Sequence, residues 1–67
     1  MFKVGDMIAG LKNGYNCAGE GMLKAEVVYT RGYPVTMGIR VLDHIDKTDI
    51  GAEVEVENRD SYFKLLD

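Results

Sequence analysis

The sequence predicts an all-β fold, a small and strongly bent five-stranded barrel, on the basis of three observations. Eight glycines divide the 67 residues so that no uninterrupted helical stretch remains. No window of a dozen residues keeps its apolar side chains at the spacing of one helix face. Several short segments alternate between apolar and polar side chains, as half-buried strands do. The length allows one domain, residues 1–67.

The first three predicted strands are residues 2–8, 24–30 and 37–42. In the first, Gly5-Asp6 interrupts the alternation, as a bulge or tight bend would. The other two alternate more regularly, so one face of each is expected to be buried. These inward faces carry Ala25, Val27 and Tyr29 in the second strand and Met37, Ile39 and Val41 in the third.

The last two predicted strands are residues 52–57 and 62–66. The former has the cleanest alternation in the chain, with three valine or alanine side chains inward and three glutamates outward. One turn of helix is expected at residues 58–61, before the last strand. The predicted core consists of Val4, Ile8, Val27, Ile39, Val41, Val54, Val56, Phe63 and Leu65.

The connections between these strands differ in character. Residues 10–21 form a long first loop rich in glycine and asparagine. Residues 31–34 form a turn, because Pro34 cannot donate to a central strand. Residues 43–51 carry aspartate-rich turn signals. A closed barrel would also remove the exposed strand edges that so short a chain cannot otherwise cover.

The segment Val4-Gly5-Asp6-Met7-Ile8 resembles the opening of many SH3-like barrels, including the KOW and Tudor types. Residues 25–28, 39–42 and 62–66 are similar to the remaining strands of that fold. The order and spacing also resemble small SH3-like proteins encoded by bacteriophages and prophages. This resemblance implies a bacterial host cell. Where a KOW motif favours glycine before the valine pair, this chain has Ala25-Glu26, which argues against ribosomal-type RNA binding.

Charge and cysteine content narrow the function classes. The net charge is −3, which gives no support to general nucleic-acid binding. Residues 1–42 carry five basic and three acidic side chains, whereas residues 43–60 carry seven acidic and two basic ones. Cross-strand pairs are expected to cancel part of this imbalance. The single Cys17 fits a reducing cytoplasm, and without an apolar run of about 18 residues no membrane span is expected.

Catalysis is not expected, because no chemical motif is complete. Gly14 and Gly19 have P-loop spacing, but Glu20 follows where a lysine must contact phosphate. Cys17 and His44 are each the single residue of their type, and nothing in the sequence brings them together. Asp43, Asp46 and Asp49 surround His44 without the spacing of a calcium loop, so they are interpreted as a solvated acidic turn. No cofactor or metal is predicted.

Protein-binding residues are predicted in two places. Glu53, Glu55 and Glu57 repeat at about 6.6 Å along one strand face, close to the roughly 7 Å between phosphates of one nucleic-acid strand. With Asp43, Asp46 and Asp49 they could occupy a basic groove on another protein, or they could simply keep an edge strand solvated. Tyr15 and Tyr33 fall in loops, where they could line a peptide groove or cover the ends of the barrel.

Three functional hypotheses remain, of which a small enzyme is the least favoured because no catalytic motif is complete. The first is a non-catalytic protein-binding module that binds a host or phage protein, for example as an acidic inhibitor or anti-defence protein. The second is a small KOW-type nucleic-acid-binding barrel, for which the basic residues of the first part of the chain would have to cluster. An outward patch of Met7, Val28 and Leu42 would suit a partner protein or a homodimer. The basic residues in question are Lys3, Lys12, Lys24, Arg31 and Arg40.

Overall fold

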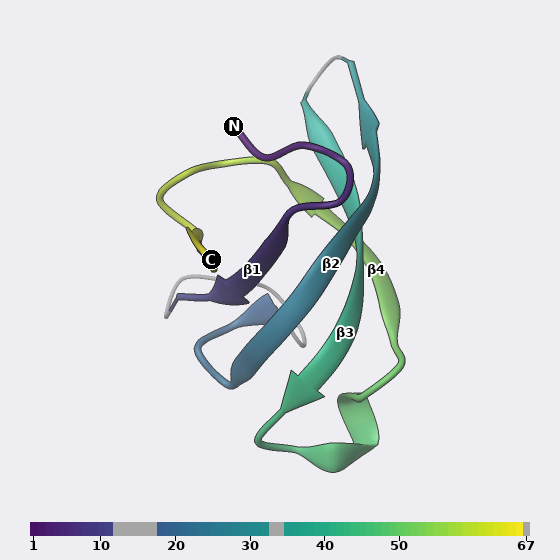
Figure 1. The fold of residues 1–67 in the computed structure, drawn as a ribbon, viewed down its shortest axis with the longest axis vertical. Helices are drawn as coiled ribbons and strands as arrows, with labels where there is room; N and C mark the ends of the chain where they lie inside the picture. Colours follow the sequence, from purple (N-terminus) through teal and green to yellow (C-terminus); the bar gives the residue numbers. More distant parts are fainter. Residues whose placement is uncertain (12–17, 33–34, 67) are drawn as a thin grey trace.

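Five antiparallel strands form a single open sheet in the computed structural model, which describes residues 1–11, 18–32 and 35–66. The order across the sheet is β4-β3-β2-β1-β5, so β1 lies between β2 and the last strand (Figure 1). Strands β1 to β4 pair in chain order, and β5 returns to pair with β1. The strands are β1 (Met7–Gly10), β2 (Met22–Arg31), β3 (Thr36–His44), β4 (Glu53–Glu57) and β5 (Phe63–Leu65).

The all-β class and the order of the five predicted strands are confirmed. Closure into a barrel is not observed, because β4 and β5 do not pair with each other in the described residues. A short 3-10 helix, η2 (Lys47–Asp49), connects β3 to β4. The helical turn predicted at residues 58–61 is not formed; these residues are not helical, and the N–H of Tyr62 instead donates to the carbonyl of Arg59 at 3.1 Å in an isolated hydrogen-bonded turn. Within the described ranges, no helix is long and apolar enough to cross a membrane.

A tight turn at residues 3–6 precedes β1. The N–H of Asp6 donates to the carbonyl of Lys3 at 3.0 Å, and the Asp6 carboxylate accepts from the Lys3 N–H at 2.9 Å. Gly5 has a φ of 93°, a left-handed conformation that glycine adopts without a Cβ clash. The predicted bend at Gly5-Asp6 is therefore confirmed, and it delays the first strand from residue 2 to Met7.

The longest strand pair, β2 with β3, is bent by three register shifts. The shift between Val27 and Tyr29 makes Val28 an extra residue on β2. Tyr29 consequently lies exposed on the outer face, not on the buried face with Val27 as predicted. The other two shifts lie around Lys24, beside the exposed Leu23 and Leu42. Since bulges increase twist, these irregularities bend the sheet strongly.

The core covers one face of the curved sheet. Val54 is half-buried and packs against it, but the predicted core positions Val4 and Leu65 are wrong, at 61% and 53% exposed. Val4 is turned outward by the Lys3–Asp6 turn, and Leu65 ends a three-residue edge strand beyond which the sheet does not continue. Confirmed core residues are Ile8, Val27, Ile39, Val41, Val56 and Phe63, and the core also contains Phe2, Ala18, Met22, Ala25 and Met37.

Candidate functional site

The predicted acidic stripe of Glu53, Glu55 and Glu57 lies on the outer side of β4, and each of its carboxylates is paired with an arginine. Oε2 of Glu53 lies 3.1 Å from Nε of Arg40, and Oε2 of Glu55 lies 3.2 Å from Nε of Arg31. Oε2 of Glu57 lies 2.6 Å from Nε of Arg59. Each solvated pair contributes only about 0–1 kcal/mol to stability. Together, however, the pairs offset the negative charge of the stripe.

The Tyr29 side chain of β2 crosses over Gly38 of β3 and reaches Glu55 of the acidic stripe. A Cβ built on Gly38 would lie 1.9 Å from Cε2 of the Tyr29 ring, so only glycine leaves room for this path. The Tyr29 hydroxyl donates to Oε2 of Glu55 at 2.7 Å, and this bond raises the pKa of Tyr29 above its ordinary value of 10.0. The Arg31 guanidinium lies 5.6 Å from the centre of the same ring, within cation–π range.

The predicted acidic turn after β3 is held together by its own hydrogen bonds. Asp46 is the N-cap of η2: its Oδ1 accepts from the N–H of Thr48 at 3.0 Å and from the Thr48 hydroxyl at 2.8 Å. These two bonds hold the pKa of Asp46 below its ordinary value of 3.8. Asp43 is exposed and lies opposite Lys24 of β2 in the strand register. The turn therefore uses one of its three aspartates to cap a helix and leaves Asp43 on the surface.

His44, the last residue of β3, contacts two aspartates of this turn. Its Nδ1 accepts from the N–H of Asp46 at 2.9 Å, and its Nε2 lies 3.5 Å from Oδ2 of Asp49. The His44 side chain is only 9% exposed. Cys17, the other residue considered for catalysis, lies outside the described residues. In the described part of the chain, no group of three or more His, Cys, Asp or Glu side chains is placed to hold a metal ion.

A hollow of about 360 Å³ lies beside the first residues of the chain. It is an open depression whose walls come from three separate parts of the sequence. Its lining residues are Met1, Phe2, Lys3, Val4, Thr30, Arg31, Gly32, Val35 and Asn58.

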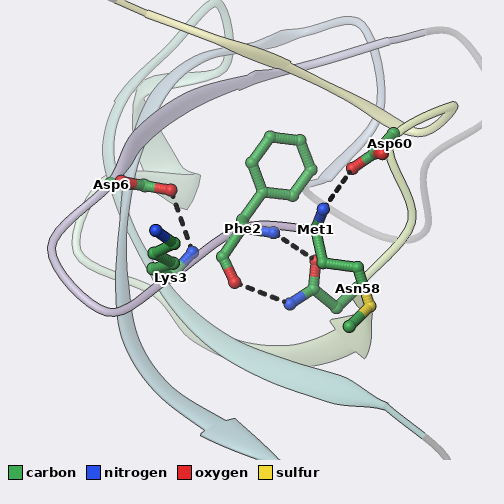
Figure 2. Close-up of polar contacts among 6 residues, drawn as sticks. All are labelled: Met1, Phe2, Lys3, Asp6, Asn58 and Asp60. Atoms are coloured by element: carbon green, nitrogen blue, oxygen red, sulfur yellow. Dashed lines mark hydrogen bonds and ion pairs between the residues drawn. The ribbon is translucent and has the colours of Figure 1, made fainter.

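Asn58 binds the backbone of Phe2, and both residues line this hollow. Its Oδ1 accepts from the N–H of Phe2 at 2.9 Å, and its Nδ2 donates to the carbonyl of Phe2 at 2.9 Å (Figure 2). At 4% exposed, Asn58 is the buried polar residue of the described chain, and its side chain is fully engaged. The Phe2 ring packs edge-to-face on Phe63 at 6.0 Å. The amino group of Met1 lies 3.1 Å from Asp60.

The charged groups that line the hollow are cationic. The Lys3 ammonium makes no ion pair or hydrogen bond with any residue the structure describes, although its backbone N–H is bonded to Asp6. Arg31 uses Nε toward Glu55, which leaves the other guanidinium N–H groups for a ligand. No carboxylate, histidine or cysteine lines this hollow in the described residues. The hollow therefore combines apolar walls with positive charge.

The remaining predicted site residues are placed as follows. Tyr15 and Tyr33 lie outside the described residues, although Gly32 and Val35, on either side of residues 33–34, line the hollow. The predicted patch is not formed as expected, since Met7 and Val28 are half-buried. Leu42 is exposed, at the end of the sheet that also carries Leu23, Ile45 and Ile50 as exposed apolar residues.

The sequence interpretation missed the hollow, because its walls are far apart along the chain. A weak signal was present in Asn58, which ends the glutamate–valine alternation with a residue that can both donate and accept. Comparison with known proteins adds nothing to this geometry: no family model, curated protein or solved structure matches the chain.

Proposed function

We propose that this protein is a non-catalytic protein-binding module with an SH3-like architecture, encoded by a bacteriophage or prophage, that binds a host or phage protein in the bacterial cytoplasm. The SH3-like part rests on the sequence resemblance and is supported by the strongly bent sheet in which β1 pairs with both β2 and β5. The bulges of β2 and β3 add to this curvature.

The observation that carries the proposal is the hollow held by Asn58. Its walls are preformed by the Asn58–Phe2 bonds and by the Lys3–Asp6 turn. A preformed site binds with a smaller loss of conformational freedom than a site that must be ordered by its partner. Among the described residues, its lining contains no acid–base pair and no nucleophile with a neighbouring base, so its chemistry favours binding over catalysis.

The acidic stripe supports the proposal less than the sequence indicated. Glu53 and Glu55 already bind Arg40 and Arg31, so a basic groove on a partner would have to compete with those arginines. The same pairing weakens the nucleic-acid alternative, since Glu53 and Glu55 offset part of the positive charge that Arg40 and Arg31 would offer to phosphates. An inhibitor that imitates nucleic acid is therefore less well supported than a module that binds through its hollow.

Affinity capture from a bacterial lysate tests this proposal with two matched variants. The hollow variant is Lys3→Ala with Val4→Ala, and the stripe variant is Glu53→Gln with Glu57→Gln. Each is first shown to melt near the wild-type temperature. A host or phage protein retained by the wild type and the stripe variant, but lost from the hollow variant, supports the proposal. Capture that depends on the stripe would move the binding site to β4, and no specific capture by the wild type would contradict a protein-binding function.

A further inference from the structure

We propose that the hollow beside Phe2 and Asn58 receives an extended protein segment that combines acidic with apolar side chains. This inference rests on the proposed protein-binding function and adds to it the chemistry of the partner. It concerns the residues of the hollow and not the acidic stripe of β4.

The charge of the hollow selects an acidic partner. Lys3 and Arg31 contribute positive charge to the lining, whereas the nearby carboxylates are engaged. Asp6 accepts from the Lys3 backbone, Glu55 binds Arg31 and Tyr29, and Asp60 lies against the amino group of Met1. A carboxylate of the partner would give the Lys3 ammonium the ion pair that it lacks in the described chain. A basic segment would meet the cations Lys3 and Arg31, whereas no carboxylate lines the hollow in the described residues.

The walls of the hollow select apolar side chains as well. Met1 and Val4 are 69% and 61% exposed, although side chains of this kind are usually buried in a core. They are not scattered, because both line the same depression together with Phe2 and Val35. Its volume of about 360 Å³ lies at the lower end of the range for small-molecule sites, about 300–1,000 Å³.

Binding at this place is expected to occur through side chains and not by addition of a strand. Asn58 already occupies both the N–H and the carbonyl of Phe2, which a strand-like partner would need. The N–H of Lys3 is likewise occupied by Asp6, and its carbonyl by the N–H of Asp6. The partner segment must therefore be recognised by its carboxylates and by the apolar side chains that enter the hollow.

A selection from a randomised peptide library displayed on phage tests the inference, with the intact 67-residue chain as the immobilised target. We expect the selected peptides to be enriched in Asp or Glu beside Leu, Ile, Val or aromatic residues. A consensus rich in Lys and Arg would overturn the acidic-partner inference while leaving a protein-binding function intact. Failure to select any consensus would contradict both.

Charge variants then locate the bound peptide. The tightest selected peptide is labelled with a fluorophore, and its dissociation constant is measured by fluorescence polarisation. We expect Lys3→Glu to weaken binding about tenfold and Lys3→Gln to weaken it less, since reversal adds repulsion to the lost attraction. Lys64→Glu is the matched control, because Lys64 is exposed on β5 and does not line the hollow. Equal weakening by Lys3→Glu and Lys64→Glu would show only a response to net charge and would overturn the inference.

Two further measurements test whether a second copy of the chain or a polyanion occupies the hollow in place of an acidic–apolar protein segment. Sedimentation of the protein alone tests whether a second copy fills the hollow, and we expect a monomer at the concentration used for polarisation. Competition with a single-stranded RNA tests a polyanion, and we expect no displacement of the peptide at physiological salt. Self-association that is abolished by Lys3→Glu, or efficient displacement by RNA, would each overturn the assignment to an acidic–apolar protein segment.

Discussion

The side-chain amide of Asn58 binds the backbone of Phe2, 56 residues earlier in the chain, through one accepted and one donated hydrogen bond. It therefore does for Phe2 what a paired strand would do. The N–H of Asn58 also donates to the carbonyl of Val35, so the residue connects the segment before β1 with the start of β3. A single side chain thus makes a connection at the edge where the sheet itself stays open.

Replacing Asn58 by alanine should destabilise the protein by about 2 kcal/mol, because the buried N–H and carbonyl of Phe2 lose their partners. Chemical unfolding followed by circular dichroism measures this loss. Ser61→Ala is the control, since Ser61 is exposed in the same connection. An unfolding midpoint for Asn58→Ala equal to that of the control would show that the two hydrogen bonds between Asn58 and Phe2 do not contribute to stability.

Replacing Gly38 by alanine should displace the Tyr29 ring, because the new Cβ would lie 1.9 Å from Cε2 of that ring. We expect a loss of about 1–3 kcal/mol, typical of overpacking a buried position. Gly32→Ala is the matched control, since a Cβ there meets nothing within 4 Å. If the ring is the obstacle, Gly38→Ala should cost much less in a Tyr29→Ala background. Equal costs in both backgrounds would show that another contact excludes the methyl group.

Titration of Tyr29 should give a pKa above 10.0, because its hydroxyl donates to the Glu55 carboxylate. The folded protein then binds the phenolic proton more tightly than the unfolded chain does. The contribution of this bond to stability is complete below the pKa of the unfolded tyrosine and is lost as pH rises through the raised pKa. NMR titration of the ring signals checks the direction. In Glu55→Gln the pKa should move back toward 10.0, and a pKa that stays raised would assign the shift to another cause.

The Asp46 cap should make the turn before β4 sensitive to acid. Because the two bonds from Thr48 lower the pKa of Asp46, their contribution to stability is present above the ordinary value of 3.8 and is lost as pH falls through the lowered pKa. We expect Asp46→Ala to lower the melting temperature at pH 7 and to have a smaller effect at pH 2. Asp43→Ala, on the exposed neighbour, is the control. A difference between the two variants that is the same at both pH values would contradict this role of the carboxylate.

The sequence predicted the parts of the fold that depend on local alternation. Ile39, Val41 and Val56 are buried because the pattern of β3 and β4 repeats every two residues, and this period fixes the face. The alternation does not show where the register between β2 and β3 shifts, so it predicts Tyr29 on the wrong face of the sheet. Val4 was assigned to the core because the turn around Gly5 was known only as a bend, without its direction.

The candidate sites were predictable to different degrees. The glutamates of β4 and the arginines of the neighbouring segments are visible in the sequence, and the expected cross-strand neutralisation is confirmed by the pairs of Glu53 and Glu55. Which arginine meets which glutamate depends on register and on side chains that cross a neighbouring strand. The hollow depends on contacts between the two ends of the described chain, around Phe2 and Asn58, which no local pattern contains.

The position of β1 between β2 and β5 also sets the order in which the molecule can fold. The β2–β3 hairpin and β4 are neighbours in sequence and can form early, whereas β1 cannot gain its second partner until residues 63–65 have been synthesised. Pairing of segments so distant in sequence slows folding, because the loop between them must close before the contacts stabilise it. Until β5 pairs with it, β1 has one hydrogen-bonding edge without a partner strand, and such unpaired edges make partly folded chains prone to aggregation.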